Sequence, residues 1–70
     1  MKVFVSPNKI AFDNFLKSNG LTRRDVIWVN NKDSVYKTYG LELKEKDIVF
    51  GYESEFIEGA KRNILSRIKR

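Results

Sequence analysis

Three short runs of apolar residues stand out from the polar background of this chain: Val3 to Val5, Val26 to Val29 and Ile48 to Phe50. Each run consists of β-branched or aromatic residues and ends at a polar residue or a glycine. Continuous apolar runs, in contrast to alternating ones, are typical of strands that are covered on both faces. The pattern therefore predicts three buried strands that are parallel and connected by crossover segments.

The segment after the first run has the pattern of an amphipathic helix. Ser6 is predicted to cap this helix, and Pro7 to occupy its first position, where the missing N–H costs nothing. Gly20 is predicted to end it in the left-handed conformation that C-terminal caps prefer. Between these limits, apolar residues recur at helical spacing and form one face: Ala11, Phe12, Phe15 and Leu16.

Two further helices are predicted after the second and third runs. The shorter one begins at Asp33 or Ser34, with Asp33 as its cap, and ends at Tyr39 before Gly40. The last helix begins at Ser54. Its predicted buried stripe consists of Phe56, Ile57, Ala60, Ile64 and Ile68.

The resulting order, β-α-β-α-β-α, predicts a single α/β domain over residues 1–70. Alternation of this kind implies a parallel sheet with right-handed crossovers, here in the strand order 2-1-3 with helices on both faces, giving three layers. One segment leaves an alternative open, because residues 41–44 alternate between apolar and charged side chains like a strand. If they pair antiparallel with residues 48–50, residues 41–51 form a hairpin and the class becomes α+β.

The chain contains neither cysteine nor histidine. Zinc fingers, zinc ribbons and nucleophilic sites of the Ser-His or Cys-His kind are therefore excluded. The sequence also lacks the glycine-rich loops that bind phosphate groups. We expect no cofactor and no enzymatic activity. An alternative is a Mg²⁺ or nucleotide site at the carboxyl ends of the strands, lined by Asp33, Glu53 and Glu55.

The apolar runs are too short for a transmembrane helix or for the apolar region of a signal peptide. The sequence therefore predicts a cytoplasmic protein that has no membrane partner. A three-stranded sheet has two open edges, and small proteins often cover such an edge by associating with a second copy. A homo-oligomer is accordingly one of the alternatives.

Basic residues outnumber acidic ones by 14 to 9, for a net charge of +5. This balance favours a polyanionic partner. Residues 61–70 hold five positive charges and no negative one, and a second cluster lies just before the second strand. On a helical wheel the basic residues scatter around the polar side, as on an ordinary solvated helix. Nucleic-acid binding is one hypothesis, with these contacts: Arg23, Arg24, Lys61, Arg62, Arg67, Lys69 and Arg70.

The aromatic residues favour a different partner. The phenylalanines fit the predicted core, whereas the three tyrosines lie in the short helix or at a strand end, where side chains can be exposed. Exposed tyrosine and arginine are common at protein interfaces. The leading hypothesis is therefore a non-enzymatic protein that binds another protein. Its predicted contacts are Tyr36, Tyr39, Tyr52, Arg23, Arg24, Arg62 and Arg67.

Two stretches, FDNFLKSNGLTRRDVIWVN at residues 12–30 and LKEKDIVFGY at residues 43–52, resemble small α/β proteins encoded by bacteriophages. The shared features are a strand, a helix that ends in Asn-Gly-Leu, and a strand that begins with Asp followed by apolar and aromatic residues. The resemblance covers most of the chain and carries no catalytic residue across. It implies an accessory protein that acts in the host cytoplasm by binding host or phage machinery.

Overall fold

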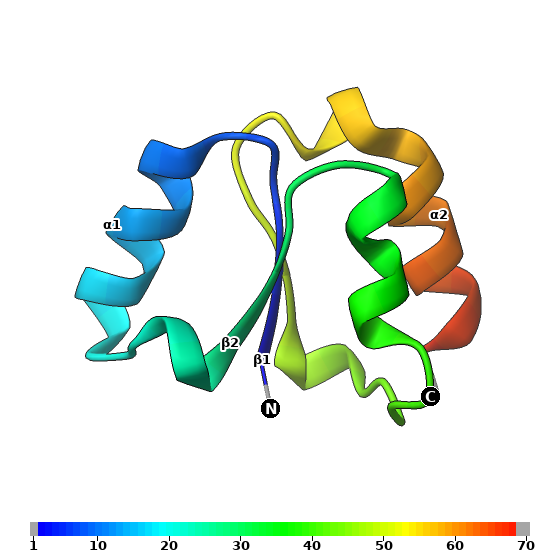
Figure 1. The fold of residues 1–70 in the computed structure, drawn as a ribbon, viewed down its shortest axis with the longest axis horizontal. Coiled ribbons are helices and arrows are strands. Elements are labelled where there is room, and N and C mark those ends of the chain that lie inside the picture. Colours follow the sequence, from blue (N-terminus) through cyan, green and yellow to red (C-terminus); the bar gives the residue numbers. More distant parts are fainter. Residues whose placement is uncertain (1, 69–70) are drawn as a thin grey trace.

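A computed structural model describes residues 2–68, which form a three-stranded parallel sheet between two layers of helices (Figure 1). The strands are β1 (Lys2–Val5), β2 (Val26–Val29) and β3 (Ile48–Phe50), in the spatial order β2-β1-β3. Phe4 of the central strand lies opposite Trp28 on one side and Val49 on the other. The predicted α/β class and the predicted strand order are both confirmed.

Helices cover both faces of this sheet. Figure 1 shows α1 (Lys9–Asn19) on one side, and the 3-10 helix η2 (Asp33–Thr38) together with α2 (Glu58–Arg67) on the other. Three shorter 3-10 helices precede β2, β3 and α2, respectively. They are η1 (Arg23–Asp25), η3 (Glu45–Asp47) and η4 (Ser54–Ile57).

Alternating side chains of the strands supply two separate apolar cores. The core beneath α1 is formed by Phe4, Phe12, Leu16 and Val26. The core beneath η2 and α2 is formed by Val3, Val5, Val29, Val35, Leu43, Ala60 and Ile64. Because each strand contributes to both cores, each needs apolar residues at successive positions, which explains the continuous runs in the sequence.

The start of α1 differs from the prediction. Asn8 is the cap, and its side-chain oxygen accepts a hydrogen bond from the Ala11 N–H at 3.0 Å. Ser6 cannot begin the helix because its backbone still belongs to the sheet, where its N–H donates to the Val29 carbonyl at 3.0 Å. The predicted roles of Ser6 and Pro7 were therefore wrong. The helix ends as predicted, with Gly20 in the left-handed region at φ 62°.

The second predicted helix is present as η2, within one residue of the expected limits. Its cap differs, because the Asn31 side chain accepts the Ser34 N–H at 2.7 Å and Asp33 lies exposed. The predicted capping role of Asp33 was therefore wrong. Gly40 follows at φ 83°, a left-handed conformation that favours glycine and that stops the segment as predicted.

The third predicted helix is divided in two. Residues 54–57 form η4, and the α-helix begins only at Glu58. Ala60 and Ile64 are fully buried as predicted, and Ile57 and Ile68 are partly buried. Phe56 is 71% exposed, so its predicted place in the core was wrong. A 3-10 helix has three residues per turn, and the buried stripe of α2 therefore does not extend back through η4.

The alternative hairpin at residues 41–51 is not present. Strand β3 pairs parallel with β1, with Ile48 opposite Val3. Leu43, which contributed to the alternating pattern, is 4% exposed and belongs to the core beneath α2. Burial of one leucine from a loop therefore accounts for the pattern that resembled a strand.

Candidate protein-binding surface

All three tyrosines are exposed, as the protein-binding hypothesis requires: Tyr36 by 62%, Tyr39 by 57% and Tyr52 by 70%. They do not form one cluster. Tyr52 lies in the turn after β3, at the carboxyl edge of the sheet, whereas η2 runs from that edge toward the opposite one (Figure 1). Tyr39 follows the end of η2, so Tyr39 and Tyr52 occupy opposite ends of the sheet.

Tyr36 and Tyr39 lie on one side of η2 because of the geometry of a 3-10 helix. Residues three apart are eclipsed in such a helix, and the Tyr39 N–H closes the last turn by donating to the Tyr36 carbonyl at 3.0 Å. The same spacing places Val35 and Thr38 on the buried side, with exposures of 6% and 0%. Burial of that pair directs the two tyrosines outward.

Arg67, at the end of α2, connects this helix to η2. One guanidinium nitrogen donates to the Thr38 hydroxyl at 2.8 Å and to the Asn63 side chain at 3.0 Å, and the other donates to the Thr38 carbonyl at 2.6 Å. The guanidinium carbon lies 5.1 Å from the centre of the Tyr39 ring, within range of a cation–π interaction. We call Tyr36, Tyr39 and Arg67 the tyrosine face.

The other predicted basic contacts point elsewhere. Lys61 lies over the Phe50 ring at 5.3 Å, and Arg62 is paired with Glu58 of its own helix at 2.9 Å. Arg23 lies 3.8 Å from Asp13 of α1. Arg24 is exposed next to Arg23 in η1, and Lys69 and Arg70 lie outside the described residues. The positive charges that the structure describes are therefore distributed over different parts of the molecule.

The predicted acidic site is not formed. Within residues 2–68, no three carboxylates come close enough to hold a metal ion. Glu53 accepts a hydrogen bond from the Asn8 side chain at 2.9 Å, which links the start of α1 to the turn after β3. The alternative of a Mg²⁺ site shared by Asp33, Glu53 and Glu55 was therefore wrong.

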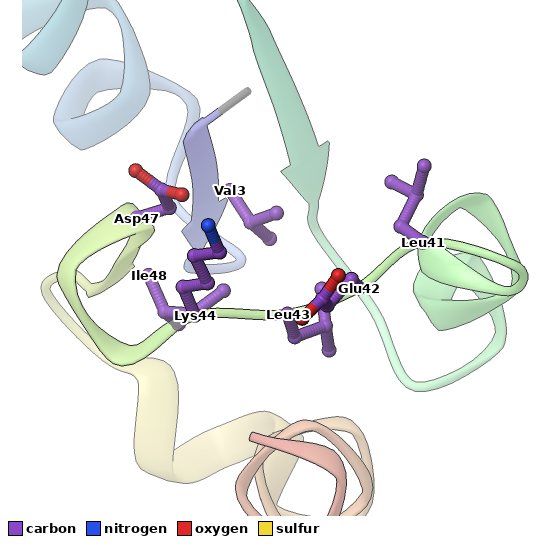
Figure 2. Close-up of a pocket in the computed structure, with 7 residues that line it drawn as sticks. All are labelled: Val3, Leu41, Glu42, Leu43, Lys44, Asp47 and Ile48. Carbon is purple, nitrogen blue, oxygen red and sulfur yellow. The ribbon is translucent and has the colours of Figure 1, made fainter. Parts of the chain in front are cut away.

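Two hollows lie beside β3. Figure 2 shows the first, of about 240 Å³, at the amino ends of β1 and β3, with an apolar floor that includes Val3 and Ile48 and a rim that carries Lys44 and Asp47. The second, of about 310 Å³, is lined by Glu45, Ile48, Phe50, Leu65 and Ile68, and we call it the edge groove.

Four exposed apolar side chains among residues 2–68 were missed by the sequence analysis: Ile10 at 72%, Phe56 at 71%, Leu41 at 44% and Leu65 at 42% exposure. Leu41 follows Gly40 directly and thus lies close in the chain to the tyrosine face. Ile10 could have been found, since it falls outside the apolar face of α1. The exposure of Phe56 depends on the 3-10 geometry of η4, for which the sequence has no clear signal.

None of the helices within residues 2–68 is long and apolar enough to cross a membrane. Comparison with protein-family models, with curated proteins and with solved structures gives no match.

Proposed function

We propose that this chain is a non-enzymatic binding protein, an accessory factor of the kind that bacteriophages encode, whose tyrosine face contacts a protein partner. The observation that carries the proposal is the fixed position of Arg67, which is hydrogen-bonded to Thr38 and lies over the Tyr39 ring. Tyrosine and arginine are the residue types that dominate the binding energy of protein interfaces, together with tryptophan. The sequence resemblance described above supports the accessory role.

Pre-organisation gives the tyrosine face its advantage as a binding surface. Ordering a flexible side chain at an interface costs about 0.5–1.5 kcal/mol. Arg67 already has its guanidinium held by three hydrogen bonds in the free protein, and it limits the positions of the Tyr39 ring. A partner that contacts these two residues therefore loses less of its binding energy to ordering.

The distribution of charge favours a protein over a nucleic acid as the partner. Nucleic-acid binding depends on basic side chains that lie along the path of the phosphates. Here the guanidinium of Arg67 is directed toward Thr38, that of Arg62 toward Glu58, and Lys61 lies at the open edge of the sheet. Nucleic-acid binding is therefore the competing hypothesis, and nuclease and salt treatment distinguish it from protein binding.

The proposal is tested by capture from a bacterial lysate with three forms of the tagged protein: wild type, a Tyr36→Ala/Tyr39→Ala double variant, and a Tyr52→Ala variant. Tyr52 is the matched control because it is also exposed and lies in the turn after β3, away from the tyrosine face. We expect wild type and Tyr52→Ala to retain a stoichiometric protein band that survives nuclease and moderate salt. The double variant should lose that band.

Two results would contradict the proposal. Retention of the band by the Tyr36→Ala/Tyr39→Ala variant would place the binding surface elsewhere. Loss of all retained material on nuclease treatment, or a steep loss with salt, would indicate phosphate contacts and hence a nucleic acid. Circular dichroism of each variant shows whether a loss of binding reflects a loss of fold.

A further inference from the structure

A second surface, independent of the tyrosine face, lies along the open edge of β3. Among residues 2–68, β3 pairs only with β1. The Gly51 N–H donates to the Val5 carbonyl at 2.8 Å, so Gly51 and, by the alternation of a parallel ladder, Val49 direct their backbone groups toward β1. The backbone N–H and carbonyl of Phe50 consequently face the open edge, where another strand can pair with them.

Apolar side chains next to this open edge line the edge groove. Ile48 and Phe50 of β3 form one wall. Leu65 of α2 and Ile68, which directly follows α2, form the other. Leu65 is 42% exposed, and the other three are partly buried. An open strand with an adjacent apolar groove is an arrangement that favours pairing with a further strand.

Two side chains of opposite charge lie near the two ends of β3. Lys61 lies over the Phe50 ring at 5.3 Å, at the carboxyl end of β3. Glu45 lines the groove at the amino end, three residues before Ile48. The described residues include no carboxylate within 4 Å of the Lys61 ammonium. The groove therefore has Lys61 near the carboxyl end of β3 and Glu45 at the amino end.

We propose that the edge groove is occupied by the edge groove of a second copy of this chain, with the two β3 strands antiparallel. In that arrangement Phe50 of each copy lies beside Ile48 of the other, and Lys61 of each copy lies near Glu45 of the other. The result is a twofold-symmetric dimer with a continuous six-stranded sheet, in which each contact occurs twice.

Both the charges and the side-chain directions select the antiparallel orientation. Parallel pairing of the two β3 strands would place Lys61 beside Lys61 and Glu45 beside Glu45, which is unfavourable. Antiparallel pairing about an axis perpendicular to the sheet keeps both α2 helices on one face. Leu65 and Ile68 of the two copies then cover one another and the two grooves become one apolar seam.

The dimer leaves the tyrosine face accessible. Arg67 and Asn63 lie on the side of α2 that contacts Thr38 of η2, whereas Lys61 and Leu65 lie on the side next to β3. The tyrosine face and the edge groove therefore lie on opposite sides of α2. Failure of the dimer leaves the proposed protein binding intact, and the reverse also holds.

Charge-swapped variants test the dimer. In sedimentation experiments from micromolar to millimolar concentration, we expect the wild-type mass to rise from 8.2 kDa toward twice that value. Lys61→Glu and Glu45→Lys each replace two attractive contacts by repulsive ones. At about 0.2–1 kcal/mol for each exposed ion pair, either change should weaken association by about tenfold.

Mixing the two variants gives the most specific result. A heterodimer of Lys61→Glu with Glu45→Lys restores opposite charges at both contacts, so the mixture should associate more tightly than either variant alone. Lys17→Glu, which makes the same charge change at an exposed position on α1, is the control and should associate like wild type.

Several outcomes would overturn the proposal: a wild-type mass that stays at 8.2 kDa at the highest concentration, a dimer that neither variant weakens, or a mixture that does not associate. A monomeric wild type would assign the groove to a different partner. Should a variant not fold, dilution of the wild-type protein followed by NMR provides a second test. The backbone amide of Phe50 should shift with concentration, while amides of α1 should not.

Discussion

Gly51 lies directly against the ring of Phe4, so that a Cβ at this position would be 2.8 Å from the Phe4 Cε1 atom and closer still to Cζ. Phe4 is 3% exposed and stacks on Phe15 with ring centres 4.7 Å apart, so its ring has no room to move away. The absence of a side chain at residue 51 thus allows the carboxyl end of β3 to close against the core beneath α1.

Replacement of Gly51 by alanine should therefore destabilise the protein. We expect Gly51→Ala to lower the free energy of unfolding by about 1–3 kcal/mol, the usual cost of overpacking a core, as measured by urea denaturation. Gly59→Ala is the control, since a Cβ there meets only the Lys32 Cβ at 3.8 Å. The control should be neutral or stabilising by up to about 1 kcal/mol. Equal effects of the two substitutions would contradict the close contact.

Ser6 connects the carboxyl ends of β1 and β3. Its hydroxyl donates to the Tyr52 carbonyl and accepts the Asn8 N–H at 3.1 Å, and the residue is fully buried. Ser6→Ala removes both hydrogen bonds and leaves the Tyr52 carbonyl and the Asn8 N–H without this partner. It should lower the free energy of unfolding by about 1–3 kcal/mol, as measured by chemical denaturation. Ser66→Ala removes a hydroxyl from an exposed position on α2 and should change stability by less than about 0.5 kcal/mol. A comparable loss in the two variants would be evidence against this role for Ser6.

Arg67 should contribute to stability through the geometry of its guanidinium. Arg67→Ala removes three hydrogen bonds to Thr38 and Asn63, and we expect a loss of about 1–3 kcal/mol in thermal or urea unfolding. Arg67→Lys should recover only part of this, because an ammonium cannot reproduce a planar fork of donors. Arg62→Ala, which breaks only an exposed pair with Glu58, should cost less than about 1 kcal/mol. Full wild-type stability of Arg67→Lys would show that the planar fork of donors is not required.

Asp25 should make stability depend on pH in the acid range. The Asp25 carboxylate accepts hydrogen bonds from the backbone N–H of Thr22 at 2.9 Å and from the Thr22 hydroxyl at 3.0 Å. These bonds, the backbone one most strongly, lower the pKa of Asp25 from its usual 3.8. A lowered pKa in the folded state means that the carboxylate stabilises the fold above pH 3.8, and that this contribution is lost as the pH falls through the lowered value. Asp25→Asn should therefore destabilise at neutral pH and have little effect in strong acid. Urea denaturation over that range checks this, and a pH-independent loss would contradict it.

Most of the fold could be predicted from the sequence because its signals are local. Apolar runs such as Val26 to Val29 mark strands that are covered on both faces, wherever the covering helices lie. Gly20 and Gly40 end their helical segments with positive φ, a conformation that glycine adopts without strain. The exposure of Tyr36 and Tyr39 also follows from local spacing, because their neighbours on η2 form the buried pair.

The candidate site was only partly predictable, because residue types do not specify which side chains meet. Arg67 was a predicted contact on account of its charge, but its interaction with Thr38, 29 residues away, depends on how α2 packs against η2. Tyr52 was grouped with the other tyrosines, and the direction of the chain places it at the opposite end of the sheet from Tyr39.

The sequence by itself determined the three strands, their parallel order and the location of the helices that cover them, since burial on both faces imposes a pattern on neighbouring residues. Only the tertiary structure decided where α1 begins, why Phe56 is exposed, and that Lys61 lies over the Phe50 ring. The physical reason is that these features depend on hydrogen bonds and packing between distant segments. The ladder that retains Ser6 in the sheet is one example, because its partner Val29 belongs to another strand.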